Sequence, residues 1–165
     1  MKLLIIGHAR HGKDTVCEML TDLLNLKFKS SSDFVNEKAV FPVLSKLYGY
    51  ETLEECYEDR VNHRPEWFNL LRAYNGEDPV RLGRELFNEY DVYCGLRNRE
   101  EYQAMKRAGL FDLVIWVDAS ERLPLETSDS MELTMSDADI VIDNNADLNR
   151  LTLITVKTAY QIKRG

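Results

Sequence analysis

Residues 3–15 decide the fold, and their sequence is Leu3-Leu4-Ile5-Ile6-Gly7-His8-Ala9-Arg10-His11-Gly12-Lys13-Asp14-Thr15. The four apolar residues form a short run that ends at a glycine, which is typical of a strand buried on both faces of a parallel sheet. After Lys13, apolar side chains recur at the spacing of an amphipathic helix, at Val16, Met19, Leu20, Leu23 and Leu24. The stretch therefore predicts a buried strand, a tight loop and a helix in immediate succession.

The loop itself matches the GxxxxGK pattern of a phosphate-binding loop, or P-loop, in the strand–loop–helix context that this pattern requires. Its glycines let the backbone curl so that N–H groups point at phosphate oxygens, and the helix start adds unpaired donors. The Lys13 ammonium is expected to lie between the β- and γ-phosphates, as a catalytic group. The alternative is a strand-to-helix turn without a ligand. We expect ATP to be bound by Gly7, Ala9, Arg10, His11, Gly12, Lys13, Asp14 and Thr15.

Asp14 stands where a P-loop usually has Ser or Thr, whose hydroxyl contacts Mg²⁺. A carboxylate can do the same, directly or through water, because Mg²⁺ prefers oxygen ligands. Thr15 is then placed to donate to an α-phosphate. We therefore predict ATP and Mg²⁺ as cofactors, with Asp14 as the metal ligand. His8 and His11 occupy variable positions of the loop and are expected to be exposed rather than to act as catalytic bases.

The rest of the chain alternates strands with helices, which predicts a parallel sheet covered on both faces. We expect a single domain, residues 1–165, with the three-layer P-loop NTPase-type fold and a central five-stranded sheet. Residues about 30–90 form a helical insertion, with breaks near Pro65 and at 76–79, and residues about 120–137 form a polar, lid-like excursion. Further strands are expected near Phe28 and at 92–96, 113–117 and 140–142, and helices at 33–47, 100–108 and 148–162. The last helix is expected to align Leu148, Leu151, Thr155, Ala159 and Ile162 on one face.

Composition limits the possible partners. The 165 residues include 21 Lys+Arg and 28 Asp+Glu, a net charge of −7, with 44% hydrophobic and 30% charged residues. These values exclude a disordered or membrane-embedded chain and argue against a nucleic-acid partner, which needs a basic face. The apolar run 3–6 is too short for a signal or membrane segment, and Cys17, Cys56 and Cys94 form no CxxC pair. We expect a cytoplasmic protein, monomer or homodimer, that acts on small molecules.

Gly12-Lys13-Asp14-Thr15 resembles the GKDT form of the P-loop in bacteriophage deoxynucleoside monophosphate kinases, which belong to the nucleoside monophosphate kinase family. Three further segments resemble that family in the same order. Residues 31–34 lie where its monophosphate-binding segment begins, residues 95–98 resemble a strand end that carries an Arg, and residues 139–145 resemble its last strand and the loop that borders adenine. The family often has Asp in the third strand, where this chain has Cys94 and Gly95.

The resemblance implies transfer of the γ-phosphoryl group of ATP to a (deoxy)nucleoside monophosphate, in the host cytoplasm if the chain is phage-encoded. It also implies that Asn144 and Asn145 lie beside the adenine, and that Arg97 and Arg122 neutralise charge on the transferring phosphate. Arg122 is the one arginine of the excursion, whereas adenylate kinases have several in their lid.

Arginines are concentrated in the insertion, where five of them and no lysine lie between residues 60 and 84. A guanidinium makes forked contacts with phosphate, and a monophosphate acceptor must have its dianion held in place. Alternatively, these arginines pair with neighbouring acids on solvated helix faces. The predicted acceptor site consists of Ser32, Asp33, Arg60, Arg64, Arg72, Arg81 and Arg84.

Two other functions remain open. A P-loop kinase could phosphorylate a hydroxyl group of another small metabolite, with Asp33 as the base. A nucleotide-binding module without turnover would explain Asp14 and the absent third-strand Asp. In either kinase the excursion 121–136 is expected to close and exclude water, unless it is an ordinary surface loop.

Overall fold

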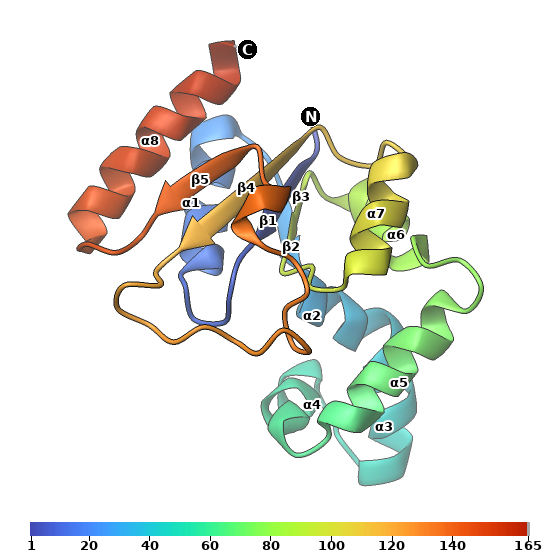
Figure 1. Cartoon of the computed structure of the whole chain (residues 1–165). Coiled ribbons are helices and arrows are strands. Elements are labelled where there is room, and N and C mark those ends of the chain that lie inside the picture. The colour runs from blue at the N-terminus through green and yellow to red at the C-terminus, as the bar shows by residue number, and fades with distance from the viewer. Residues whose placement is uncertain (165) are drawn as a thin grey trace.

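The computed structural model describes residues 1–164, and its centre is a five-stranded parallel sheet (Figure 1). The strand order is β2-β3-β1-β4-β5, so β1 lies in the middle and pairs with both β3 and β4. All four strand pairs are parallel, as expected. The strands are β1 (Leu3–Ile6), β2 (Phe28–Ser30), β3 (Val92–Cys94), β4 (Leu113–Asp118) and β5 (Ile140–Asp143).

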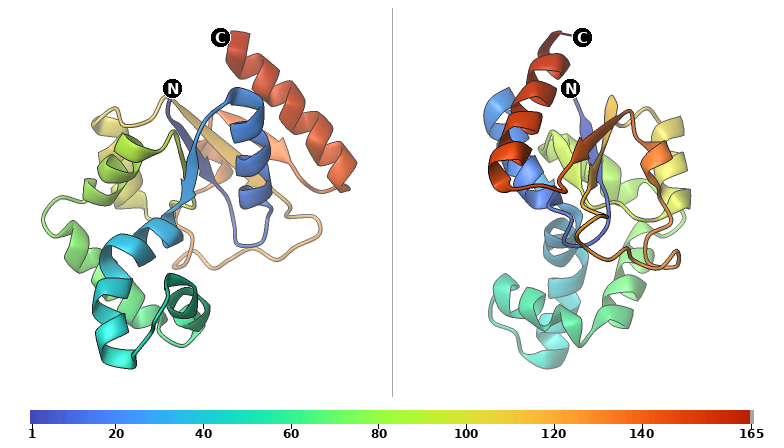
Figure 2. Two further views of the ribbon diagram at one scale, coloured as in Figure 1. Left: turned by 180° about the vertical axis from the view of Figure 1, so that it is seen from behind. Right: turned by 60° about the vertical axis from the view of Figure 1, so that its left-hand side comes forward.

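Helices cover both faces of the sheet (Figure 2). The helices α1 (Lys13–Leu24) and α8 (Leu148–Arg164) pack together on one face, and α6 (Arg81–Glu89) and α7 (Arg99–Arg107) lie on the other. Side chains of β1 alternate between these two layers, because successive residues of a strand point to opposite faces. Leu3 and Ile5 enter the core under α1 and α8, while Leu4 and Ile6 enter the core under α6 and α7. The expected three-layer fold is confirmed.

The helical insertion lies between β2 and β3, beyond the carboxyl ends of the strands (Figure 1). It begins as one helical stretch with a π-helical turn in its middle and continues through shorter helices. Pro65 lies in the first turn of α5 and Gly76 follows its end, so both predicted breaks are helix boundaries. The helices are α2 (Ser31–Val35), η1 (Asn36–Val40), α3 (Phe41–Tyr48), α4 (Leu53–Glu58), η2 (Asp59–Val61) and α5 (Arg64–Asn75).

The polar excursion runs from Ala119 to Asp139 and contains one short helix, η3 (Met135–Asp137). Its second half is anchored, because Met131 and Leu133 are buried in the core under α6 and α7. Arg99 also holds this half, through bonds to the Glu132 carbonyl at 2.7 Å and to the Asp137 carboxylate at 2.5 Å. The first half crosses the P-loop and has no helix or strand.

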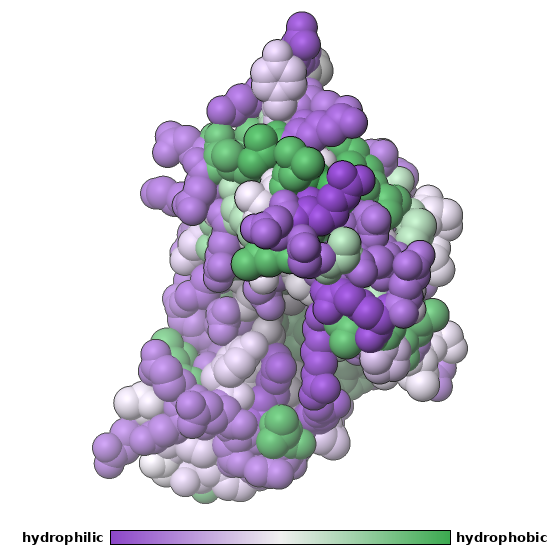
Figure 3. Space-filling view, turned by 90° about the vertical axis from the view of Figure 1, so that its left-hand side faces the viewer, coloured by the Kyte–Doolittle hydropathy of each residue, from purple (hydrophilic) through white to green (hydrophobic). Residues whose placement is uncertain are grey.

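The predicted face of the last helix was partly wrong. Leu148 is 62% exposed, and the buried side chains of α8 are Leu151, Thr155, Thr158 and Ala159. Leu148 is the first residue of the helix, and the whole stretch 146–150 around it is exposed. The opposite side of α8 exposes Leu153, Val156 and Tyr160, and apolar surface lies among polar side chains on that side of the molecule (Figure 3). Within residues 1–164, no helix combines the length and apolar character needed to span a bilayer.

Glu101 of α7 is a buried acid in the layer that covers β3. It is 8% exposed, and its carboxyl accepts a hydrogen bond of 3.2 Å from the Tyr93 hydroxyl, which is itself buried. Burial raises the pKa of Glu101 from 4.5 to about 7, although the Tyr93 bond opposes this shift. The folded protein therefore holds a proton on Glu101 that the unfolded chain releases at lower pH.

We expect Glu101→Gln to remove a pH-dependent loss of stability. Protonated Glu101 contributes fully to the free energy of unfolding below pH 4.5, its pKa in the unfolded chain. This contribution is lost as pH rises through about 7, its pKa in the folded protein. Gln can still accept the Tyr93 hydrogen bond but carries no charge. Urea unfolding should therefore give similar free energies near pH 4, and a variant that is more stable by on the order of 3 kcal/mol near pH 8. Equal free energies at the higher pH would contradict this account.

Candidate nucleotide site and acceptor cleft

The P-loop is held in a curled conformation that only glycine can adopt at two positions. Gly7 has φ +143°, and a Cβ there would lie 2.5 Å from the Val117 carbonyl oxygen of β4. Gly12 has φ +92°, and a Cβ there would overlap the Asn144 side chain. Arg10 between them also has a positive φ, of 65°. The loop is thus pressed between the carboxyl ends of β4 and β5.

Lys13 lies at the start of α1 and folds back over the loop. Its side chain is almost fully buried, and its ammonium group donates to the His8 carbonyl oxygen at 2.7 Å. Burial lowers the pKa of Lys13 from its usual value, because removal from water disfavours the charged form. A buried ammonium beside inward-facing backbone N–H groups makes this loop strongly attractive to anions.

Asn144 supports the loop from behind. Its side-chain amide donates to the His11 carbonyl oxygen at 2.9 Å, and its backbone N–H donates to the Asp118 carbonyl oxygen at 2.6 Å. Arg122 donates to the Asn144 carbonyl oxygen at 2.6 Å, and Asn145 donates to the Asp118 carboxylate at 3.1 Å. The structure therefore brings Asn144, Asn145 and Arg122 together on the β5 side of the P-loop.

The two loop histidines are not exposed, contrary to the sequence-based expectation. His11 is fully buried, and its Nδ1 accepts the Ala119 N–H at 3.0 Å. His8 is mostly buried, with its ring edge-on to Trp116, and its Nδ1 accepts the Glu126 N–H at 3.1 Å. Both rings are thus acceptors for the excursion that crosses the loop. Sequence could not show this, because their bonding partners lie more than 100 residues away.

Asp14 is exposed at the mouth of the loop and accepts a weak hydrogen bond from the Cys94 thiol at 3.4 Å. Cys94 ends β3, so a thiol occupies the place where the resembling family often has a carboxylate. Mg²⁺ at nucleotide sites is held by one or two carboxylates together with substrate phosphates and water. Asp14 supplies one such carboxylate, so these residues fit Mg²⁺ that is bound mainly through the nucleotide. Residues 1–164 contain no cluster of three or more His, Cys, Asp or Glu side chains arranged to hold a metal ion.

Arg97 lies at the carboxyl end of β3 and points to the loop mouth. It forms an ion pair with Glu126, which is far along the chain, rather than with the nearby Glu100 or Glu101. The same Glu126 carboxylate accepts the Ala9 N–H of the P-loop at 2.5 Å. The sequence does not identify Glu126 as a site residue, because nothing distinguishes one acid within a polar excursion until the chain folds over the loop.

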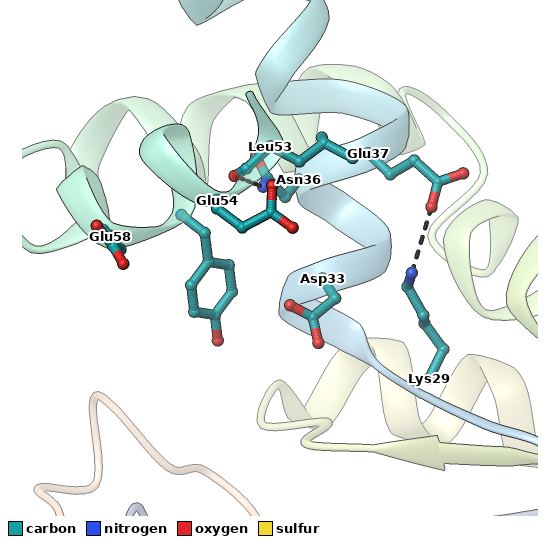
Figure 4. A pocket seen from close by; sticks show the side chains of 8 residues that line it. Lys29, Asp33, Asn36, Glu37, Leu53, Glu54 and Glu58 are labelled. Atoms are coloured by element: carbon teal, nitrogen blue, oxygen red, sulfur yellow. Dashed lines mark hydrogen bonds and ion pairs between the residues drawn. The ribbon is translucent and has the colours of Figure 1, made fainter. Parts of the chain in front are cut away.

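Two cavities adjoin each other beside the loop, and both are lined by Asp33 and Tyr57. The larger, of about 270 Å³, is lined by Lys29, Asp33, Asn36, Glu37, Leu53, Glu54, Tyr57 and Glu58. The smaller, of about 210 Å³, is lined by Asp14, Glu18, Phe28, Ser30, Ser32, Asp33 and Tyr57. We call them together the acceptor cleft. Figure 4 shows Asp33 and Glu54 facing the same space, with Lys29 turned toward Glu37, 3.4 Å away.

The cleft is more acidic than the sequence suggested, because most of the predicted arginines lie elsewhere. Arg60 stacks over Tyr57, with its guanidinium carbon 4.7 Å from the ring centre, and so lies beside the cleft. Arg81 pairs with Glu85 at 3.1 Å, and Arg84 pairs with Asp78 at 2.6 Å. Arg81 and Arg84 therefore form the solvated ion pairs with neighbouring acids that the sequence offered as the alternative to phosphate binding. Arg64 and Arg72 are exposed on α5, and Arg72 stacks on Phe68.

No family model matches this sequence, and no curated protein sequence matches it. Solved structures do match in fold. A shikimate kinase from Aquifex aeolicus is 18% identical, with a TM-score of 0.50, covering 100% of this chain and 99% of that chain. A gluconokinase from Sinorhizobium meliloti is 12% identical with a TM-score of 0.53, covering 98% and 92%. A shikimate kinase from Bacteroides thetaiotaomicron is 12% identical with a TM-score of 0.52, covering 99% and 98%.

The chain has the fold of P-loop kinases. At these identities the likeness shows the architecture alone, and it agrees with the central parallel sheet and the helices on both of its faces.

We expect Asn144→Ala to weaken ATP binding about tenfold or more. The His11 carbonyl oxygen would lose its buried hydrogen-bond donor, and the P-loop would no longer be held in its curled conformation at that point. The stability cost should be about 1–2 kcal/mol, the usual effect of leaving one buried acceptor unpaired. Calorimetric titration with Mg·ATP measures the affinity, and thermal unfolding measures the stability. Asn62→Ala, which removes an exposed side chain of the insertion, is the control. Unchanged affinity in a folded Asn144→Ala protein would contradict the role.

Proposed function

We propose that this protein transfers the γ-phosphoryl group of ATP to a small acceptor, and that the acceptor is a (deoxy)nucleoside monophosphate. One observation carries the proposal: a curled P-loop with a buried lysine opens directly beside a cleft formed by a helical insertion. Asp14 belongs to both the loop and the cleft lining, so a donor phosphate and an acceptor group could meet there. Positioning and electrostatics supply most of the catalysis in such transfers.

The donor side of this proposal uses the loop and its neighbours. The loop N–H groups and Lys13 hold the phosphates, Thr15 donates to the α-phosphate, and Asp14 holds Mg²⁺, which neutralises charge on the phosphate oxygens when it is bound. Arg97, at the loop mouth, neutralises the charge that develops on the transferring group. Asn144 and Asn145 lie on the β5 side of the loop, where the family resemblance places adenine. Arg122 donates to the Asn144 carbonyl oxygen, and its predicted contact with the transferring phosphate stays a prediction.

The acceptor side rests on fewer groups than the sequence suggested. Arg60 is the insertion arginine beside the cleft, and we assign it to the acceptor phosphate, together with Arg97. Ser32 and Asp33 line the cleft, and the Ser32 hydroxyl lies 3.2 Å from that of Tyr57. Carboxylates accept hydrogen bonds, so they would bind the amino groups of a base or the hydroxyl of a sugar. Arg64, Arg72, Arg81 and Arg84 have no place in this arrangement.

A second candidate is a kinase that phosphorylates a hydroxyl group of a small metabolite. Its specific support is the acidity of the cleft, in which Lys29, the one cation of the lining, already pairs with Glu37. An acidic cleft repels a dianion but suits a hydroxyl acceptor, with Asp33 as the general base. The structures with similar folds are named shikimate kinase and gluconokinase, so a small-metabolite acceptor fits as well.

A nucleotide-binding module without turnover is the third possibility. Cytoplasmic location, a phage-infected host and oligomeric state stay predictions.

ADP release with Mg·ATP, measured across a panel of nucleoside monophosphates and hydroxylated metabolites, tests the proposal. We expect turnover that requires one or a few monophosphates and falls about 100-fold or more in Lys13→Ala. Lys46→Ala, which removes an exposed cation of α3, is the matched control and should keep its rate. ATP binding without acceptor-dependent ADP release across the whole panel would favour the non-catalytic module.

Two substitutions distinguish the acceptor classes. For a monophosphate acceptor, Arg60→Ala should raise the KM of that acceptor about tenfold or more, because a phosphate contact is lost, while the exposed Arg72→Ala should not. For a hydroxyl acceptor, Asp33→Asn should lower kcat at least 100-fold through loss of the base. Steady-state kinetics with varied acceptor at saturating ATP gives both constants. Arg60→Ala and Arg72→Ala proteins with the same KM would contradict the monophosphate assignment of Arg60.

A further inference from the structure

A carboxylate of the protein itself lies in the mouth of the P-loop. One oxygen of Glu126 accepts the Ala9 N–H at 2.5 Å, and the other pairs with the Arg97 guanidinium. The backbone N–H of Glu126 donates to His8 Nδ1 at 3.1 Å, which fixes the residue against the loop. The side chain is 21% exposed, so it is inserted into the loop mouth rather than lying over it.

The surroundings of this carboxylate are those of an anion site. The buried Lys13 ammonium and the Arg97 guanidinium contribute positive charge, and Ala9 contributes an inward-facing backbone donor. Burial alone would raise the pKa of Glu126, but the bonds from Arg97 and Ala9 outweigh it and hold that pKa below its usual range. Glu126 is therefore ionised, and it satisfies donors that a phosphate oxygen would otherwise take.

We propose that Glu126 is an internal anion that occupies part of the phosphate site, and that a bound nucleotide displaces it. This inference rests on the nucleotide-binding half of the proposed function. Phosphate oxygens take over the Ala9 N–H and the Arg97 guanidinium, and the like charge of the phosphates repels the released carboxylate. Arg97 thus loses its ion pair with Glu126 and forms one with the nucleotide. Binding of ATP therefore also places a cation beside its phosphates.

Contacts with the rest of the protein hold the excursion on both sides of Glu126. On one side, the Ala119 N–H is held by the buried His11 ring at 3.0 Å. On the other side, Met131 and Leu133 are buried, and Arg99 holds the Glu132 carbonyl oxygen and the Asp137 carboxylate. Glu121 and Arg122 are held as well, by bonds from the Glu121 N–H to Asn145 at 2.9 Å and from Arg122 to the Asn144 carbonyl oxygen at 2.6 Å. Release of Glu126 therefore frees only a short segment, about residues 125–130, between two fixed ends. Exposed Leu125 beside it has no buried contact to lose.

The test compares Glu126→Ala and Glu126→Gln with Glu121→Gln as the control. Glu121 lies in the same excursion, is exposed, and has no ion-pair or hydrogen-bond partner for its carboxylate among the described residues. The control therefore makes the same change in charge without touching the loop. By calorimetric titration we expect Mg·ATP to bind about tenfold more tightly to Glu126→Ala, with a smaller gain in Glu126→Gln. Glu121→Gln should bind like the wild type.

A second measurement needs no nucleotide. Amide hydrogen exchange of Ala9 in the nucleotide-free protein should be slow in the wild type and in Glu121→Gln, and several-fold faster in Glu126→Ala, because its acceptor is gone. Unchanged exchange at Ala9 would overturn the inference.

The titration has outcomes that separate this inference from the proposed function. Equal or weaker ATP binding in Glu126→Ala, when the wild type binds, would overturn the displacement, and an equal gain in Glu121→Gln would reduce it to an effect of net charge. If neither the wild type nor any variant binds ATP, the proposed function fails and displacement by nucleotide fails with it. Exchange at Ala9 then decides whether Glu126 occupies the loop at all.

Discussion

The close approach of the P-loop backbone to the ends of the central strands is the constraint on which the rest of the structure depends. Gly7 passes against the Val117 carbonyl oxygen of β4, and Gly12 passes against Asn144 after β5, both at positive φ. These contacts are possible because β1 pairs with β4 and β4 pairs with β5, which puts the carboxyl ends of β4 and β5 beside the loop. The sheet order therefore determines the loop conformation, and the loop conformation determines where N–H groups can meet an anion.

A loop curled in this way gathers positive charge and must find a counter-charge. Lys13 is buried, Arg97 lies at the mouth, and Ala9 turns its N–H inward, while the chain as a whole carries a charge of −7. In an acidic protein the nearest available anion is one of its own side chains, and Glu126 fills that place. The two histidines help to keep Glu126 at this position, because each accepts a backbone N–H from the excursion and so holds the excursion across the loop.

Local patterns made the sheet, the P-loop and the helix boundaries predictable from the sequence. Pro65 and Gly76 mark the two ends of α5 because proline suits a first turn and glycine suits the residue after the last. The arginines of the insertion were harder to place, because their environment depends on which way each helix faces. Arg81 and Arg84 share a face of α6, as their spacing required. Arg81 pairs with Glu85 on the same helix and Arg84 pairs with Asp78 just before it, and neither arginine lines the cleft. The contacts of His11, Cys94 and Glu126 join distant segments, and no local pattern encodes them.

The charge of the cleft constrains the acceptor whichever class it belongs to. Asp33 and Glu54 face the same space, and Glu58 also lines the cleft. Lys29 cannot offset them, because Glu37 already neutralises it. Any molecule that fills the cleft must therefore present hydrogen-bond donors there, since an acceptor atom would leave these oxygens desolvated and unpaired. If it also carries a phosphate, that dianion has to lie toward Arg97 or Arg60, away from Glu54. The amino groups of a base and the hydroxyl groups of a sugar meet the first condition, and a nucleotide oriented with its phosphate toward the P-loop meets both.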